Sequence, residues 1–280
     1  MVKVLLLGKG FVGKKLGAFL TEQGADIFHI AQNEIDYTSH YTFSTLLRDY
    51  NFTHVINCCG YTGKPNVDGC ESNKDECWKY NVTVAEMIDR LSYCFGKKCI
   101  HISSGCIYTG YEKEFTELDT PNFGLYNPES SFYSKSKHAL ETIINTKLSA
   151  VLRIRMPYTG VHEDKNYLIK ILKYDNLISM PNSVTSIDDL CVFISKFVND
   201  FRPGIYNVVN PQPIESKEIV NILQKYNLIN ANWKFIEVKD LNVIANRSNC
   251  VLNTDKIKSI GLCLPDTHES IERSIKSLCS

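Results

Sequence analysis

The sequence predicts an α/β fold: a doubly wound parallel sheet of the Rossmann type with a smaller C-terminal substrate lobe. Apolar runs of strand length alternate with amphipathic helical segments over roughly the first 155 residues, the pattern of a parallel sheet. The first of these strands runs into a Gly-x-Gly-x-x-Gly turn. Beyond Pro157 the pattern is mixed and irregular. We therefore expect a dinucleotide-binding domain over residues 1–156 and a substrate-binding lobe over residues 157–280, with some segments of the lobe returning to the first sheet.

The opening strand, residues 2–7, is continuously apolar, which is typical of a strand buried on both faces. A helix with an apolar face follows the glycine turn and ends near Gly24. The glycines permit a tight turn and close approach of a pyrophosphate, and the N-terminus of the helix offers it free N–H groups. The residues expected to hold a dinucleotide here are Gly8, Lys9, Gly10, Phe11, Val12 and Gly13.

The other elements follow from periodicity and end signals. Further strands are expected at residues 26–30, 53–57, 98–103, 150–155 and 204–209. Helices are expected at residues 39–50, 75–91, 131–144, 186–197, 216–226 and 267–278. Residues 105–130 hold Gly, Pro and aromatic residues without periodicity, so they are expected to form a long functional loop.

Tyr133 and Lys137 lie four residues apart on a predicted helix that Ser130 or Ser131 can cap, so both side chains face the same way. A free phenol titrates near pH ~10, and a nearby ammonium lowers that value toward neutrality. Such a pair can protonate a carbonyl oxygen while a hydride attacks the carbon. Chance alone supplies about one such spacing in this composition. The second match is the segment 93–97, which we interpret as an exposed helix end.

Composition excludes several classes of protein. The formal net charge is +0, which argues against a general binder of nucleic acid or membrane surfaces. No apolar run approaches the ~18 residues of a membrane span, and the opening segment is too short for a signal peptide. The 11 cysteines form no Cys-x-x-Cys pair, so we expect reduced thiols in a cytoplasmic protein and no metal site.

The choice of cofactor depends on the segment after the second strand. That strand runs to Gln32 without an acid that could hold a ribose hydroxyl, and Asp36 comes later. Lys9, Lys14 and Lys15 lie around the glycine turn and suit a 2′-phosphate. The sequence therefore favours NADPH, with NADH as the alternative.

Taken together, these motifs resemble the extended short-chain dehydrogenase/reductase family. The segments that carry the resemblance are Gly8-x-Gly10-x-x-Gly13, residues 57–62, Ser103-Ser104 and Tyr133…Lys137. More narrowly, the chain resembles the bifunctional 3,5-epimerase/4-keto-reductases that complete UDP-rhamnose, which are related to dTDP-4-dehydrorhamnose reductases. That likeness is carried by residues 62–68, 70–72, 105–107, 131–135, 153–157, 181–183 and 247–249.

The resemblance implies roles for individual residues. Ser104 and Tyr133 would bind the 4-keto oxygen of the substrate, and Lys137 would hold the nicotinamide ribose. The segment expected to line the cofactor after the third strand is Cys59, Gly60 and Tyr61. The residues expected to contact the nucleotide sugar are Ser104, Asn66, Asn182, Arg247 and Asn249.

Epimerisation requires an additional acid and base. A 4-keto group acidifies the C–H bonds at C3 and C5, and each proton removal gives an enolate with its charge on the same oxygen. The resemblance makes Cys106 a candidate because simple 4-keto reductases usually carry Tyr at this position, and a cation beside a thiol favours the thiolate. Lys170 is a candidate because it interrupts an apolar helix face. The alternatives without a catalytic role are that Cys106 is a small residue packed in the loop and that Lys170 extends its ammonium to water.

The sequence therefore predicts conversion of UDP-4-keto-6-deoxy-D-glucose to UDP-L-rhamnose. A 4-keto reductase without epimerase activity and a non-catalytic cofactor-binding regulatory subunit are the alternatives. The resemblance implies that a separate 4,6-dehydratase supplies the substrate. The sequence leaves open whether the chain forms a homodimer.

Overall fold

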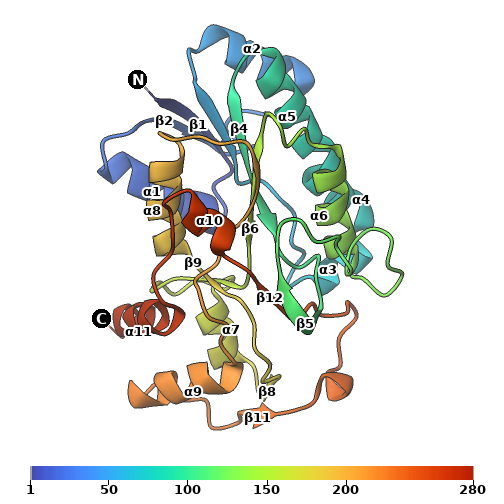
Figure 1. The fold of residues 1–280 in the computed structure, drawn as a ribbon, viewed down its shortest axis with the longest axis vertical. Coiled ribbons are helices and arrows are strands. Elements are labelled where there is room, and N and C mark those ends of the chain that lie inside the picture. The colour runs from blue at the N-terminus through green and yellow to red at the C-terminus, as the bar shows by residue number, and fades with distance from the viewer. Residues whose placement is uncertain (1, 280) are drawn as a thin grey trace.

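A six-stranded sheet forms the centre of the computed structural model, which describes residues 2–279. All its strands are parallel, and their order is β10-β6-β4-β3-β1-β2 (Figure 1). The strands are β1 (Lys3–Leu7), β2 (Asp26–Ile30), β3 (His54–Asn57), β4 (Lys98–Ser104), β6 (Ala150–Ile154) and β10 (Gly204–Asn207). The chain moves one way from β1 to β2 and then builds outward from the other side of β1. This order confirms the predicted doubly wound sheet.

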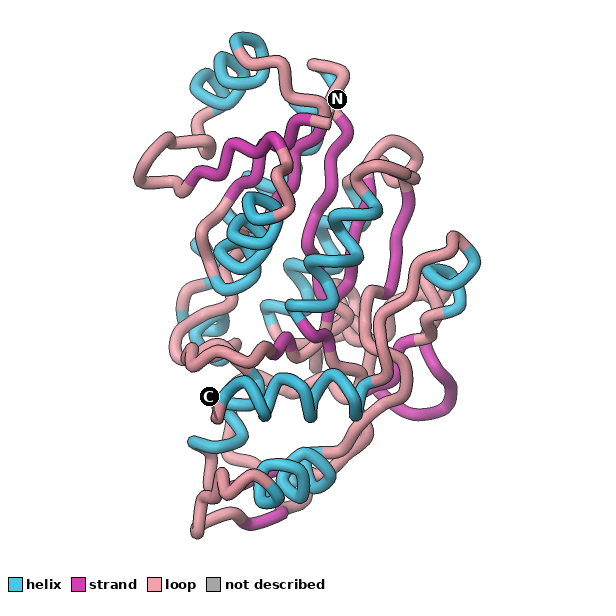
Figure 2. Tube along the Cα trace, turned by 90° about the vertical axis from the view of Figure 1, so that its left-hand side faces the viewer, coloured by secondary structure: helices cyan, strands magenta, loops and turns pink. Residues whose placement is uncertain are grey.

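Helices cover both faces of this sheet, as Figures 1 and 2 show. One face carries α1 (Phe11–Glu22), α8 (Ile187–Phe197) and α10 (Asp255–Ser259), and the other α2 (His40–Asp49), α5 (Val84–Cys94) and α6 (Phe132–Ile143). Successive residues of β1 serve the two sides: Val4 and Leu6 pack in the core with α1 and α8, and Leu5 and Leu7 in the core with α2 and α5. The first strand is therefore apolar throughout because both of its faces are buried, as predicted.

The expected loop over residues 105–130 is partly wrong, because it contains β5 (Gly110–Phe115). This strand pairs in parallel with β12 (Cys250–Leu252) in a separate two-stranded sheet. Residues 111–114 are exposed, so β5 carries no apolar alternation. A strand held by one short distant partner leaves little periodic signal in sequence.

The single helix expected over residues 75–91 is also more complex. The chain forms α3 (Asp68–Ser72), α4 (Lys74–Trp78), a π-helical turn η1 (Lys79–Thr83) and then α5. A π-turn inserts an extra residue into the helical period, so it changes which side chains face the core.

The C-terminal lobe has its own apolar core, built chiefly by three helices. These are α7 (Tyr167–Lys173), α9 (Ser216–Lys225) and α11 (Thr267–Leu278), with the short strands β7 (Pro157–Tyr158), β8 (Asn176–Leu177), β9 (Thr185–Ser186) and β11 (Lys234–Phe235) and the turn η2 (Val238–Asp240). β10 and α8 come from this half of the sequence and complete the central sheet and its cover. The division at residue 157 stays a prediction. Within residues 2–279, no helix has the length and apolar character needed to cross a membrane.

Candidate active site

The segments predicted to carry chemistry meet at the carboxyl edge of the central sheet. Gly8 follows β1, Gly60 lies just after β3, Ser104 ends β4, and Arg155 follows β6. In open parallel sheets, ligands bind at this edge where the strand order reverses. Here the reversal lies between β1 and β3.

Tyr133 and Lys137 lie on the first turns of α6, which begins where the sequence indicates. Of the two candidate caps, Ser131 accepts a hydrogen bond from the backbone N–H of Ser134. Both side chains are buried, and the Lys137 ammonium lies 5.9 Å from the centre of the Tyr133 ring. The second match, Tyr93 and Lys97, does not lie on one helix, because α5 ends before Lys97. Tyr93 is also 60% exposed, so this pair is not part of a buried site.

The pKa of Tyr133 in the chain alone is raised, whereas the sequence analysis expected a pKa nearer neutrality. Burial has the largest influence and raises the pKa of Tyr133 well above its ordinary value, while the hydrogen bond with Ser104 acts in the opposite direction. Burial also favours the neutral form of Lys137, and therefore lowers its pKa. A phenol held in its protonated form is suited to donate to an oxygen that gains negative charge.

Ser104 and Cys106 lie beside this phenol. Ser104 is 5% exposed, and its hydroxyl accepts a hydrogen bond from the backbone N–H of Cys106 at 3.2 Å. Cys106 is half-buried and packs against a small cluster formed by Tyr133, Cys70 and Cys77. The structure therefore brings together a hydroxyl, a phenol and a thiol, as the sequence analysis expected.

The residues expected to contact the nucleotide sugar fall into two groups. Asn182 donates to the side-chain oxygen of Asn249 at 3.0 Å and accepts from Arg155 at 2.6 Å. Arg247 instead forms a two-pronged ion pair with Asp68, at 2.7 and 3.1 Å. The two groups are linked along the chain, because Arg247 belongs to one and Asn249 to the other.

Two further predicted residues occupy the surroundings of these groups. Asn66 accepts a hydrogen bond from the backbone N–H of Asp68 at 2.9 Å, so it shapes the loop whose acid holds Arg247. Lys170 is half-buried on α7. Its pKa is lowered by burial and, to a smaller extent, by the cations Lys165 and Arg247. Lys170 therefore lies on the lobe side, among positive charges.

The glycine turn has the shape that a dinucleotide requires. A Cβ atom at Gly13 would lie 1.9 Å from the carbonyl oxygen of Gly8, so only glycine fits there. Gly10 is the N-cap of α1 and has no side chain to cover the first N–H groups of the helix. A cavity of about 540 Å³ opens here between Gly10, Phe11, Lys14 and residues 162–173 of the lobe. These features fit a diphosphate at the helix N-terminus.

The lysines around this turn are less free than the sequence suggests. Lys9 pairs with Glu34 at 2.6 Å, and Lys15 pairs with Asp188 at 2.9 Å. Glu34 also accepts from the backbone N–H of Ala31, so a carboxylate does follow the second strand. The sequence analysis missed it because Glu34 lies in the turn after the strand end. The charge argument for NADPH therefore rests mainly on Lys14.

Sequence reasoning also missed Asn81, which lies in the π-turn η1. Its side chain accepts from the backbone N–H of Tyr61 at 2.8 Å and donates to the backbone oxygen of the same residue at 2.9 Å. It also donates to the hydroxyl of Ser136 on α6 at 3.0 Å. A buried Asn within an apolar helix pattern is the signal that could have indicated it. Asn81 thus joins the segment after β3 to the helix of Tyr133.

Comparison with known proteins gives a family for this arrangement. A family model described as the RmlD substrate binding domain matches residues 2–279. The chain belongs to this family. The predicted membership of the extended short-chain dehydrogenase/reductases is thereby confirmed.

Two relatives of this RmlD-family chain come from Arabidopsis thaliana. A bifunctional dTDP-4-dehydrorhamnose 3,5-epimerase/dTDP-4-dehydrorhamnose reductase is 31% identical over 267 residues, which are 91% of this chain and 86% of that protein. A trifunctional UDP-glucose 4,6-dehydratase/UDP-4-keto-6-deoxy-D-glucose 3,5-epimerase/UDP-4-keto-L-rhamnose-reductase is 31% identical over 92% of this chain. The match spans only 39% of that longer protein.

Solved structures share the fold. The L780 UDP-rhamnose synthase from Acanthamoeba polyphaga mimivirus superposes with a TM-score of 0.89 at 23% identity, covering 99% of this chain and 100% of that one. A dTDP-4-dehydrorhamnose reductase from Bacillus anthracis, in complex with NADP, superposes with a TM-score of 0.84 at 20% identity, covering 99% of both chains.

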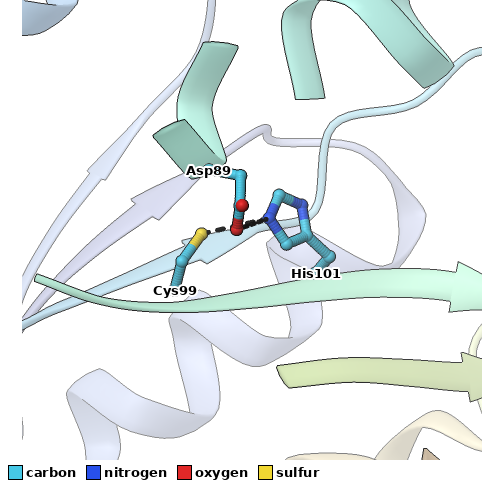
Figure 3. Close-up of side chains that lie close together, drawn as sticks. All are labelled: Asp89, Cys99 and His101. Carbon is cyan, nitrogen blue, oxygen red and sulfur yellow. Dashed lines mark hydrogen bonds and ion pairs between the residues drawn. The ribbon is translucent and has the colours of Figure 1, made fainter. Parts of the chain in front are cut away.

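One further cluster in this RmlD-family chain has donors of the kind that bind metals. Asp89, Cys99 and His101 are buried between α5 and β4, with their ligand atoms within 4.8 Å of one another (Figure 3). Asn57 accepts from the backbone N–H of Cys59 with its oxygen, so its amide nitrogen donates to Nδ1 of His101. Nε2 then carries the proton that points to Asp89 at 3.1 Å. A metal would need the lone pair of that nitrogen, so the arrangement favours a hydrogen-bond chain that fixes the segment after β3.

Proposed function

We propose that this chain is a bifunctional enzyme that converts UDP-4-keto-6-deoxy-D-glucose to UDP-L-rhamnose. Epimerisation at C3 and C5 comes first, and NADPH-dependent reduction at C4 follows. The observation that carries the proposal is the thiol of Cys106 beside the phenol of Tyr133 and the hydroxyl of Ser104. The names of the Arabidopsis relatives support both half-reactions.

The donors around the ketone oxygen serve both reactions. In the reduction, Ser104 and Tyr133 hold the oxygen, and Tyr133 gives it a proton while hydride comes from the nicotinamide. Lys137 holds the ribose and keeps a positive charge near the oxygen. In the epimerisation, the same two donors stabilise the enolate that forms when a proton leaves C3 or C5. One set of donors can therefore lower both barriers.

Cys106 and Lys170 are the proposed acid and base of the epimerisation. Cys106 lies on the side of Ser104, and Lys170 lies on α7 of the lobe with its pKa lowered by burial. A lysine with a lowered pKa can exchange protons near neutrality. Inversion needs proton removal on one face of the ring and delivery on the other, so the proposal assigns one face to each of these two residues.

NADPH is the proposed cofactor, with NADH as the alternative. Lys14 lines the cavity at the glycine turn and can meet a 2′-phosphate. Solved structures of the same fold hold NADP in one case and NAD⁺ in another. The nucleotide sugar itself must come from a 4,6-dehydratase, because that reaction creates both the 4-keto group and the 6-deoxy carbon.

Solvent exchange tests the two half-reactions separately. The chain is incubated with the UDP-linked 4-keto sugar in deuterated water without cofactor, and nuclear magnetic resonance follows deuterium at C3 and C5. We expect exchange in the wild type, none in Cys106→Ala, and hydride transfer to a pre-epimerised ketone in both. Cys94→Ala, at an exposed cysteine, is the matched control.

Tyr133→Phe should slow both half-reactions, by about 10²–10⁴-fold for the reduction. No deuterium exchange in the wild type would leave a reductase without epimerase activity. Equal exchange in Cys106→Ala would remove that thiol from the mechanism.

A further inference from the structure

Arg155 is a buried cation whose hydrogen bonds all go to neutral groups. It follows β6 and is 1% exposed. Its acceptors are the backbone oxygens of Gly105 and Ser248, the hydroxyl of Ser248, the amide oxygen of Asn182 and the thiol of Cys106. Its Nε has no partner, and within residues 2–279 no carboxylate lies within ion-pair distance of it. By contrast, its neighbour Arg153 has a carboxylate at 2.6 Å.

An uncompensated buried charge is costly, by several kcal/mol per ion after relaxation. A site that holds one gains when a negative charge forms nearby. The groups around Arg155 that can carry such a charge are Cys106, Cys250, Tyr111 and Tyr167.

Burial disfavours a negative charge on three of these four groups. Burial raises the pKa of Cys250 and of Tyr167, and it raises the pKa of Tyr111 to about 12. Cys106 differs in its geometry, because its sulfur lies 3.8 Å from Nη1 of Arg155 and accepts a hydrogen bond from it. The same guanidinium binds Asn182, so it touches both the thiol and an expected substrate residue.

We propose that Arg155 is the counter-ion of the Cys106 thiolate, a positioning residue that prepares this thiol to remove a proton from the sugar. The inference rests on the proposed epimerase function. In the step, the thiolate takes the proton from C3 or C5 and an S–H bond forms. The C–H electron pair moves to the ketone oxygen, so the negative charge passes from sulfur to the enolate.

The phenol and thiols that face Cys106 do not supply this charge, and the buried cation Lys137 lies 5.9 Å from the centre of the Tyr133 ring. Tyr133 approaches from α6, Cys70 and Cys77 from α3 and α4, and Cys250 from β12. These groups are a phenol and thiols, which are neutral when protonated and negative when ionised. Arg155 is therefore the cation with a hydrogen bond to the Cys106 sulfur.

Alkylation of the full chain by iodoacetamide tests the proposal without the enzymatic reaction. The thiolate displaces iodide, and mass spectrometry of the peptide containing Cys106 gives the rate as a function of pH. Cys94 is exposed and serves as an ordinary thiol in the same sample. Arg155→Met and Arg155→Gln remove the charge, and Arg155→Lys retains it. Arg155→Gln keeps an amide donor, so the test stands if Arg155→Met does not fold.

We expect neutral variants to move the midpoint of the Cys106 alkylation profile upward by about one to three pH units, the effect of one opposite charge at this distance. The rate at pH 7 should fall about tenfold or more. Arg155→Lys should stay within about one unit of the wild type. Ser248→Ala, which removes a 2.8 Å hydrogen bond to Arg155 but no charge, should retain the wild-type profile.

Identical profiles in Arg155→Gln and the wild type would overturn the proposal, as would an equal shift in Ser248→Ala. A wild-type chain with a low alkylation midpoint and no deuterium exchange into the sugar would instead contradict the proposed function alone.

Discussion

Replacing Glu141 by Gln tests how the helix of Tyr133 is held against the sheet. Glu141 lies on α6, one turn beyond Lys137, and its side chain is 4% exposed. Its carboxylate accepts from Nη2 of Arg153 at 2.6 Å, from Nε of the same residue at 3.0 and 3.2 Å, and from the hydroxyl of Ser103 at 3.1 Å. The pair thus joins α6 to β6 and β4, the strands that end next to Arg155 and at Ser104.

The magnitude follows from the charge that remains. Arg153 is 2% exposed, so Glu141→Gln would leave a buried guanidinium without its counter-ion. Removing one partner of a buried pair costs about 3–5 kcal/mol. At about 2 °C per kcal/mol for a chain of this size, the melting temperature should fall by about 6–10 °C.

Urea unfolding followed by circular dichroism measures this cost. The double variant Glu141→Leu/Arg153→Met removes both charges, and we expect it to be more stable than Glu141→Gln, because apolar groups of similar volume often replace buried ion pairs at little cost. A Glu141→Gln chain within about 1 kcal/mol of the wild type would refute the reasoning, because surface ion pairs have that magnitude. A double variant as unstable as the single one would show that packing, rather than the unpaired charge, is responsible.

Two other perturbations have defined outcomes. Burial lowers the pKa of His54 from 6.5 to about 4, so the unfolded chain binds the extra proton between these values and the free energy of unfolding should fall as the pH falls through that window. At about 1.4 kcal/mol per pH unit, the loss of unfolding free energy should reach about 3 kcal/mol. His54→Gln should flatten the pH dependence of the urea midpoint. An unchanged pH dependence in this variant would exclude His54 as the cause of the loss. Glu34→Gln should free Lys9 and raise the ratio of kcat/KM for NADPH over NADH about tenfold, the value of one charge-assisted hydrogen bond. Glu22→Gln, at the exposed end of α1, is the control, and a ratio that moves equally in both variants would contradict this role of Glu34.

The parts of the fold that the sequence predicts are those with local causes. The buried residues of β1 and the glycine at position 13 reflect contacts within one strand, one turn and one helix. The strand β5 escapes prediction because its residues 111–114 are exposed and its partner lies far along the chain. The π-turn around Asn81 escapes because one inserted residue shifts the helical period too little to be recognised in a short apolar segment.

The site shows the same division. The spacing of Tyr133 and Lys137 on one helix is a local property, and it is present in the structure. Whether burial or a neighbouring charge dominates the pKa of Tyr133 depends on residues from several segments. The pairing of Lys9 with Glu34 and the isolation of Arg155 likewise arise from chain segments that meet only after folding.

The edge position of β10 has a consequence for synthesis on the ribosome. When only residues 1–156 have emerged, β6 has an unpaired outer edge, and Leu16 and Leu20 of α1 lack the cover of α8. An open apolar edge of this kind pairs readily with other chains. We therefore expect residues 1–156 to be prone to aggregation until Asn207 has left the exit tunnel, and a premature stop at codon 157 to yield inclusion bodies.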